Sequence, residues 1–212
     1  MVTSSRLRSW AVPLVKPHVR RVQFRLAEMT SRSEPSGVDG IPLPPGPLRR
    51  LNGHRDFMTM GRGIVADLVR HAGVGPGDDV LDVGCGSGRV AIPLIETLGP
   101  DGSYEGFDVV PEAVGWCSRT ITPVYPNFRF QVADVYSHHY HRKGTQAAED
   151  YVFPFHDDRF QVVFLTSIFT HLGAAPTERY LRECGRVLRS GGRIFATFFL
   201  VDDVAAAAIA GS

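Results

Sequence analysis

The chain has 212 residues, a length that suits one domain or a domain with an appendage rather than a large multidomain protein. Apolar residues make up 43% and charged residues 21% of the sequence, which disfavours global disorder and a collagen-like chain. The net charge of +1 is unevenly divided, because residues 1–53 carry nine Lys or Arg against three Asp or Glu, and residues 54–212 carry fourteen against nineteen. An acidic body gives no support to nucleic acid as the main ligand.

The cysteines and the apolar runs exclude further classes. Cys85, Cys117 and Cys184 are odd in number and widely spaced, so they predict neither a disulfide framework nor a metal site and favour a reducing, cytoplasmic compartment. The longest apolar runs, 194–201 and 204–210, are shorter than the roughly 20 residues that span a bilayer. We therefore expect no transmembrane segment.

Residues 1–54 are predicted to form a basic, proline-rich arm and linker. Seven prolines between positions 13 and 47 interrupt any periodicity, so residues 41–47 are expected to be extended linker rather than helix. A short helix is predicted over 19–29. The arm is interpreted as solvated, with a transit peptide and a contact to an acidic partner or membrane surface as the alternatives.

From residue 55 onward, helical and strand-like patterns alternate. Apolar spacing predicts helices over 57–72, 90–98 and 111–121, and strands over 80–83, 104–107, 128–132, 161–165 and 194–201. A last helix is expected to open at Pro176 and to end at Gly191, where a missing Cβ permits the left-handed conformation. The alternation predicts an α/β core over 55–201, an open, doubly wound, mostly parallel sheet with helices on both faces, followed by an Ala-rich tail, 202–212.

The first predicted strand runs into a glycine-rich turn. Asp82 is followed by glycines at 84, 86 and 88, which let the backbone turn sharply and approach a ligand, while the next helix offers its free amides. A dinucleotide fingerprint would need glycine where Arg89 stands, and a P-loop would need Gly-Lys-Ser or Gly-Lys-Thr. A nicotinamide-dependent oxidoreductase is therefore only a remote alternative.

Together with later motifs, this turn resembles that of the class I S-adenosylmethionine-dependent methyltransferases. The resemblance covers roughly 57–200 and includes an aspartate at the end of the second strand and another after the third. It implies a Rossmann-like fold, S-adenosylmethionine as cofactor, and methyl transfer. The cofactor-binding residues that it implies are Asp82, Val83, Gly84, Cys85, Gly86, Gly88, Asp108, Val109, Asp134, Val135 and Thr166.

The resemblance gives each aspartate a role, and each has a structural alternative. Asp108 would accept hydrogen bonds from both ribose hydroxyls, or it would only be a carboxylate at the start of a helix. Asp134, with the amide of Val135, would recognise adenine, or it would be an ordinary turn aspartate. Asp82 would lie near the amino-acid end of the cofactor, or it would fix the glycine turn by bonding to the amides of that turn.

Catalysis of this reaction chiefly requires alignment of an acceptor, so no metal is expected. His171, after the fourth strand, is the candidate acid–base residue, with a purely structural histidine as the alternative. The segment lacks the Asn-Pro-Pro-Tyr or Asp-Pro-Pro-Tyr pattern of methyltransferases that act on planar amines, which favours another small-molecule acceptor. The connection 136–159 is long enough for a lid or binding loop that helps to select it.

Members of the family generally have a seven-stranded sheet, and only twelve residues follow Leu200 here. We therefore expect a sheet truncated after strand five, with the edge 194–201 exposed and available for self-association. A sheet cut short in this way would also permit a second function, a non-catalytic module that binds the cofactor or only retains the fold.

Overall fold

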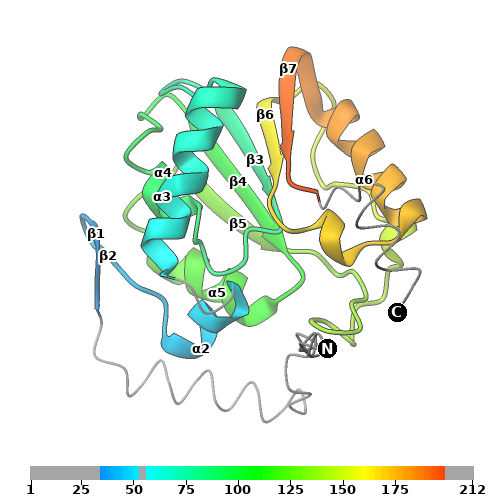
Figure 1. The fold of residues 1–212 in the computed structure, drawn as a ribbon, viewed down its shortest axis with the longest axis horizontal. Helices are drawn as coiled ribbons and strands as arrows, with labels where there is room; N and C mark the ends of the chain where they lie inside the picture. The colour runs from blue at the N-terminus through cyan, green and yellow to red at the C-terminus, as the bar shows by residue number, and fades with distance from the viewer. Residues whose placement is uncertain (1–33, 53–55, 199–212) are drawn as a thin grey trace, which may run out of the picture.

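The computed structural model describes residues 34–52 and 56–198. A short antiparallel hairpin, β1 (Pro35–Val38) and β2 (Ile41–Pro42), precedes a five-stranded parallel sheet with the order β5-β4-β3-β6-β7 (Figure 1). The strands of this sheet are β3 (Asp79–Val83), β4 (Ser103–Asp108), β5 (Phe128–Val132), β6 (Phe160–Leu165) and β7 (Leu188–Ala196). Because the chain adds β4 and β5 on one side of β3 and then β6 and β7 on the other, the strand order reverses at β3.

Helices cover both faces of the sheet. Figure 1 shows α3 and α5 on one face and α6 on the other. The α-helices are α2 (Gly46–Arg49), α3 (Phe57–Asp67), α4 (Ala91–Leu94), α5 (Pro111–Thr120) and α6 (Ala174–Val187). A π-helical turn, η2 (Leu68–Ala72), extends α3, and the short 3-10 turns are η1 (Arg50–Asn52), η3 (Ala148–Asp150) and η4 (Phe169–His171).

Local sequence explains where the predicted helices begin and end. The Asp56 carboxylate caps α3 by accepting a hydrogen bond of 2.8 Å from the Thr59 amide. Gly73 ends η2 in the left-handed conformation, with φ of 65°. Pro111 opens α5, where a missing amide hydrogen costs nothing.

Strand alternation divides the core into two layers. Val80 and Tyr104 belong to the cluster under α3, α4 and α5, whereas Leu81 and Phe107 belong to the cluster under α6. All four side chains are at most 2% exposed. This burial on both faces explains the nearly continuous apolar runs of the parallel strands and confirms the predicted α/β fold.

The expected truncation after strand five is not confirmed, since the described residues contain β6 and β7 among seven strands. Five of these strands form the main sheet and two form the hairpin. β7 lies at the edge of the described sheet, where Ile194 is 40% exposed. Self-association through this edge stays a prediction.

Three sequence predictions about local structure are wrong. Residues 41–47 are not a linker, because they contain β2 and the start of α2, and Ile41 and nearby Leu48 are buried in the core. Gly191 has the expected left-handed φ of 78°, yet it lies in an irregular part of β7 rather than at the end of α6. The helix predicted over 90–98 is shortened to four residues.

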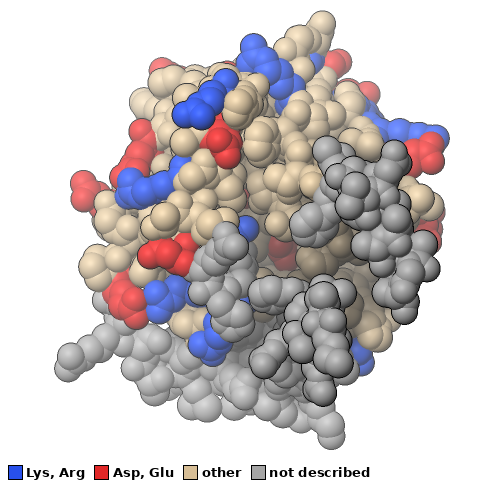
Figure 2. All heavy atoms as spheres, viewed as in Figure 1, with Lys and Arg blue, Asp and Glu red and all other residues tan. Residues whose placement is uncertain are grey.

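The surface charge of the described residues is mixed in sign. Figure 2 shows Lys and Arg side chains beside Asp and Glu side chains over the face that it presents, with uncharged residues between them. This face is therefore a mixed surface rather than a basic one.

Other predictions lie outside the described residues. The helix over 19–29 and the tail 202–212 are among them. Within the described part, no helix combines the length and the apolar character needed to cross a membrane. In the same part of the chain, no group of three or more His, Cys, Asp or Glu side chains is arranged to hold a metal ion.

Candidate cofactor site

All the residues implied by the resemblance lie at the carboxyl edge of the sheet. The glycine turn follows β3, Asp108 ends β4, Asp134 follows β5, and Thr166 follows β6. These four strands are parallel neighbours, so their carboxyl ends lie along one edge. In open α/β sheets this edge, at the point where strand order reverses, is where ligands bind.

The glycine turn has a fixed backbone conformation. Gly84, Gly86 and Gly88 have φ values of 85°, 53° and 82°, which side chains with a Cβ rarely adopt. The Gly84 and Cys85 amides both donate to the Phe107 carbonyl, at 2.8 and 3.0 Å. The turn is therefore attached to the end of β4.

Gly84 also lies under the loop that follows β6. A Cβ added to it would lie 2.1 Å from the Ile168 Cδ1 atom. The backbone conformation therefore favours glycine at this position, and any larger residue would also force the Ile168 side chain to move.

Asp108 connects the glycine turn to the start of α5. Its Oδ2 accepts from the Gly86 amide and its Oδ1 from the Val110 amide, both at 2.9 Å. The adjacent Val109 is half-buried. These two hydrogen bonds fix the Asp108 carboxylate between the glycine turn and the start of α5.

Asp82 is the most deeply buried acid of the edge. Its side chain is 1% exposed, its Oδ2 accepts a 2.7 Å hydrogen bond from the Tyr104 hydroxyl, and its Oδ1 has no partner in the described part of the chain. Burial raises the pKa of Asp82 to about 7, with a further contribution from the charge of Asp108, while the Tyr104 hydrogen bond and the charge of Arg89 oppose the rise.

The two cysteines near this turn have no features of nucleophiles. Cys85 and Cys117 are buried, and both thiols lie within 3.9 Å of the Gly86 carbonyl oxygen. Burial raises the pKa of each thiol well above its usual range. Cys85 is therefore a small, apolar component of the turn.

Asp134 is positioned differently from the other two aspartates. It is exposed and accepts from the Thr145 side chain and, at 3.3 Å, from the Thr145 amide, and the His141 Nε2 atom lies 3.5 Å away. The Thr145 hydrogen bond is the main reason that the pKa of Asp134 is lowered. Its carboxylate thus fixes the loop that follows β5, while the adjoining Val135 is buried.

This loop, which we call the β5 loop and define as residues 134–146, is closed on itself. The Tyr136 amide donates to the Gln146 carbonyl, and the Gln146 amide donates to the Asp134 carbonyl. A Cβ on Gly144 would lie 2.3 Å from the Val135 backbone, so glycine permits the two arms to approach. The sequence predicted a connection here but gave no sign of this internal structure.

The β5 loop reaches the segment that carries the candidate base. The Tyr140 ring meets the His171 ring edge to face, with 6.0 Å between centroids. His171 is exposed at the end of η4, and Thr166 is half-buried at the end of β6. Because β4 and β3 lie between β5 and β6, the loop crosses the edge near the glycine turn and Asp108.

The N-terminal hairpin region also contacts the glycine turn. The Ser87 hydroxyl donates to the Leu48 carbonyl of α2 at 3.1 Å, and both residues are at most 1% exposed. The segment assigned by sequence to a linker therefore holds one side of the turn.

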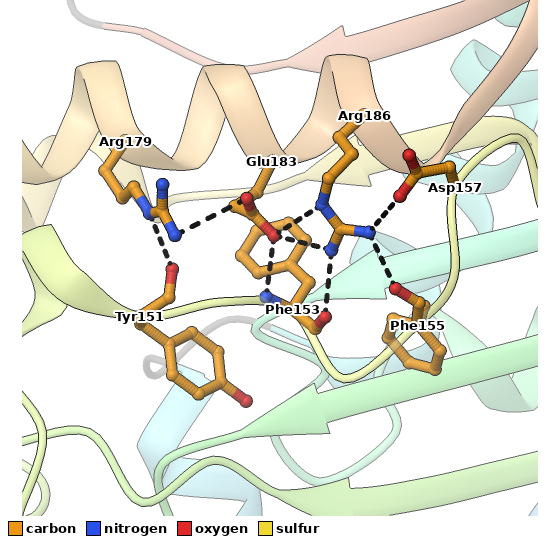
Figure 3. Close-up of polar contacts among 7 residues, drawn as sticks. All are labelled: Tyr151, Phe153, Phe155, Asp157, Arg179, Glu183 and Arg186. Atoms are coloured by element: carbon orange, nitrogen blue, oxygen red, sulfur yellow. Dashed lines mark hydrogen bonds and ion pairs between the residues drawn. The ribbon is translucent and has the colours of Figure 1, made fainter.

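An ion cluster around the buried carboxylate of Glu183 fixes the chain on the other side of the sheet (Figure 3). The Glu183 Oε2 atom accepts from the Phe153 amide at 2.9 Å and from the Arg186 guanidinium at 2.6 Å. Arg186 also donates to the carbonyls of Phe153 and Phe155 and to Asp157. Burial tends to raise the pKa of Glu183, but these hydrogen bonds outweigh it and lower the pKa.

The cluster supports the site indirectly. It holds the segment that carries Tyr151 and Phe153 against α6, and both rings pack on Phe107, at 5.8 and 4.9 Å between centroids. Phe107 directly precedes Asp108 and accepts the amides of the glycine turn. The cluster is therefore part of the framework behind the cofactor edge.

Sequence reasoning missed Tyr104, Ile168 and Thr145 as members of the site. The register Val80↔Tyr104 places Tyr104 on the same face of the sheet as Asp82, so strand alternation could have identified this pair. Ile168 reaches Gly84 from the short segment between β6 and η4, and Thr145 reaches Asp134 from the other arm of the β5 loop; no local pattern indicates either contact.

Known families and solved structures show similarity to this chain. The family profile described as "Methyltransferase domain" matches residues 80–192. A probable cobalt-precorrin-6B C(15)-methyltransferase (decarboxylating) of Thermoplasma acidophilum is 35% identical over 65 residues, which are 30% of this chain and 32% of that protein. Nocamycin O-methyltransferase of Saccharothrix syringae is 49% identical over 39 residues, 18% of this chain and 14% of that protein. The chain thus aligns with a third or less of either relative.

Solved structures support the fold. A Pyrococcus horikoshii protein superimposes with a TM-score of 0.51 at 17% identity, over 68% of this chain and 58% of that chain. A candidate S-adenosyl-L-methionine-dependent methyltransferase of Methanococcus maripaludis gives 0.50 at 14% identity, over 73% and 63%. At these identities the likeness concerns the fold alone.

Proposed function

The chain belongs to the class I S-adenosylmethionine-dependent methyltransferases, whose domain its residues 80–192 match, and on that premise we propose that it transfers a methyl group from S-adenosylmethionine to a small-molecule acceptor. The observation that carries the proposal is the joining of the glycine turn to Asp108 at the carboxyl edge of the sheet. Two relatives named for methylation of a cobalt-precorrin and of nocamycin support a small-molecule acceptor. Their names differ between carbon and oxygen, so the acceptor atom stays open.

The residues present fit the cofactor. The turn at Gly84, Gly86 and Gly88 gives a close backbone approach, and Asp82 keeps one buried carboxylate oxygen without a partner in the described residues. We assign the two ribose hydroxyls to Asp108, whose carboxylate is held beside the glycine turn by the Gly86 amide. We assign adenine contacts to Asp134 and Val135, with Asp134 also fixing the β5 loop.

S-adenosylmethionine supplies a methyl group made electrophilic by its sulfonium. The residues of this chain then have to hold the acceptor in line with that group and to exclude water. Alignment of two reactants can supply about 7–11 kcal/mol of the barrier. We assign acceptor contacts to the β5 loop and to His171. The loop reaches His171 through the ring of Tyr140.

His171 is the proposed acid–base residue. It is exposed at this edge and lies against Tyr140, so an acceptor between the loop and the glycine turn could transfer a proton to its imidazole. Once an acceptor has been found in a library of small alcohols, phenols and amines, His171→Gln should lower kcat by about 10²–10⁴. An unchanged kcat would leave His171 a structural residue.

The deciding experiment is calorimetric titration with S-adenosylhomocysteine, the product form of the cofactor. Wild type should bind, and Asp108→Ala should bind about tenfold to several hundredfold more weakly, because charged hydrogen bonds contribute about 1.5–3 kcal/mol. Asp101→Ala, an exposed turn residue before β4, should match wild type. A wild type that does not bind, or an Asp108→Ala variant with wild-type affinity, would refute the proposal.

The alternatives have lost their support. A non-catalytic module was suggested by a sheet cut short, and that expectation is not confirmed. For an oxidoreductase, Arg89 stands where a dinucleotide fingerprint needs glycine. The matches described above include no oxidoreductase.

A further inference from the structure

Tyr104 forms a buried pair with Asp82, and Tyr104 itself has no role in the assignments above. They lie on the adjacent strands β4 and β3, and their side chains are 0% and 1% exposed. The Tyr104 ring is held by Phe128 and Phe130, at 5.0 and 5.3 Å between centroids. The direction of its hydroxyl toward the Asp82 Oδ2 atom is therefore fixed.

Only one of the two Asp82 oxygens is satisfied. Oδ2 accepts from Tyr104 at 2.7 Å, while Oδ1 accepts no hydrogen bond within 34–52 and 56–198. An ionised carboxylate that is buried with an unsatisfied oxygen is costly, and a ligand that brings a donor removes this cost. A donor that reached Oδ1 would therefore satisfy the one Asp82 oxygen that has no partner in the described residues.

The groups around Asp82 set its charge in the free protein. Asp108, from the end of β4, disfavours its ionisation, and Arg89, from the end of the glycine turn, favours it. Cys85 and Cys117 are nearby thiols, which burial keeps protonated. With burial as the largest influence, the pKa of Asp82 is about 7, so a large fraction of the free protein is protonated at neutral pH.

We propose that Tyr104 is a positioning residue for cofactor binding: its hydroxyl holds the Asp82 Oδ2 atom, so that Oδ1 receives the ammonium group of S-adenosylmethionine as Asp82 gives its proton to solvent. The inference rests on the proposed function. The balance is simple, since a neutral carboxyl and a ligand ammonium become a carboxylate, the same ammonium and one released proton. No bond other than O–H breaks.

Two measurable consequences follow from this exchange. Near pH 6, where Asp82 is mostly protonated, binding should release close to one proton, and near pH 8 it should release few. Affinity should rise with pH through the range near 7, by up to about tenfold per unit below it.

Tyr104→Phe tests the positioning role because it keeps the ring between Phe128 and Phe130 and removes only the hydroxyl. Without this hydrogen bond the ionised form of Asp82 is less favoured, so proton release should extend to higher pH. At pH 7 the affinity for S-adenosylhomocysteine should fall about tenfold, and it should recover toward wild type near pH 9. A merely structural role for Tyr104 would lower affinity equally at every pH.

The experiment is titration calorimetry of the full chain with S-adenosylhomocysteine at pH 6, 7, 8 and 9, each in two buffers with different enthalpies of ionisation. The matched control is Tyr125→Phe, whose hydroxyl donates instead to the Asp39 carbonyl and should leave the pH profile unchanged. Asp82→Asn has no proton to lose and should abolish release at Asp82.

Each outcome decides the inference. Wild-type binding without proton release at pH 6, or a Tyr104→Phe profile that coincides with that of wild type, overturns it while cofactor binding and the proposed function stand. If wild type binds no S-adenosylhomocysteine at any pH, both fail. Should Tyr104→Phe not fold, proton release by wild type and its loss in Asp82→Asn still decide the matter.

Discussion

Replacing Asp82 by asparagine removes a carboxyl group whose ionised form the fold disfavours. In the unfolded chain this carboxyl titrates near its ordinary pKa of 3.8, and in the folded chain burial raises the pKa to about 7. Between these values the unfolded chain has lost the proton and the folded chain retains it. Stability must therefore fall as the pH rises, by about 1.4 kcal/mol per pH unit.

From pH 5 to pH 7 wild type should lose about 2 kcal/mol of stability, because the slope weakens as the pH approaches the folded-state pKa, and Asp82→Asn should show no such loss. A buried amide without a partner for its NH₂ group costs about 1–3 kcal/mol, but this cost is the same at every pH and cancels when slopes are compared. The free energy of unfolding of the variant should thus rise relative to that of wild type as the pH rises, whichever protein is the more stable at pH 5.

The assay is urea unfolding of ligand-free protein, followed by circular dichroism at half-unit steps from pH 5 to pH 8. Asp101→Asn, at an exposed turn, serves as the control and should run parallel to wild type. If the stability profiles of Asp82→Asn and wild type are also parallel, Asp82 does not titrate in this range and the reasoning is refuted.

Two further predictions concern the framework. Glu183→Gln should lower the free energy of unfolding by about 2–4 kcal/mol, because it leaves the guanidinium of Arg186 without its buried carboxylate. Glu178→Gln breaks an exposed ion pair on the same helix and should lower it by less than about 1 kcal/mol in the same urea assay. Equal losses would contradict this account. Gly84→Ala should destabilise the chain and weaken S-adenosylhomocysteine binding at least about tenfold, since its φ is 85° and its Cβ would meet Ile168. Ile168→Ala combined with it should restore part of the stability, and strictly additive losses would exclude the contact as the cause.

The sequence predicted those parts of the fold that local periodicity controls. The strand predicted over 128–132 coincides with β5, and Gly73 ends its helix as expected, because both depend on residues close in the chain. The hairpin before residue 43 was missed because its burial depends on contacts of Val38 and Ile41 with a distant core, while its prolines suggested a linker.

Motif spacing indicated where the three aspartates lie but not what they contact, and their roles in binding stay predictions. Strand order brings Asp82, Asp108 and Asp134 to one edge, as motif spacing indicated. The hydrogen bond from Tyr104 to Asp82 depends on a side-chain contact between separate strands. The hydrogen bond from Thr145 to Asp134 spans a long loop. Neither contact leaves a periodic signal in the sequence.

The self-contained β5 loop has a consequence for how such a protein could change its acceptor. Its hydrogen bonds are largely internal, and it reaches η4 through the contact between the Tyr140 and His171 rings. On the proposed function, new acceptor preferences could arise by exchanging this loop while the glycine turn and the sheet stay unaltered. Acceptor choice would then change in the β5 loop while cofactor binding is kept by the glycine turn and the sheet.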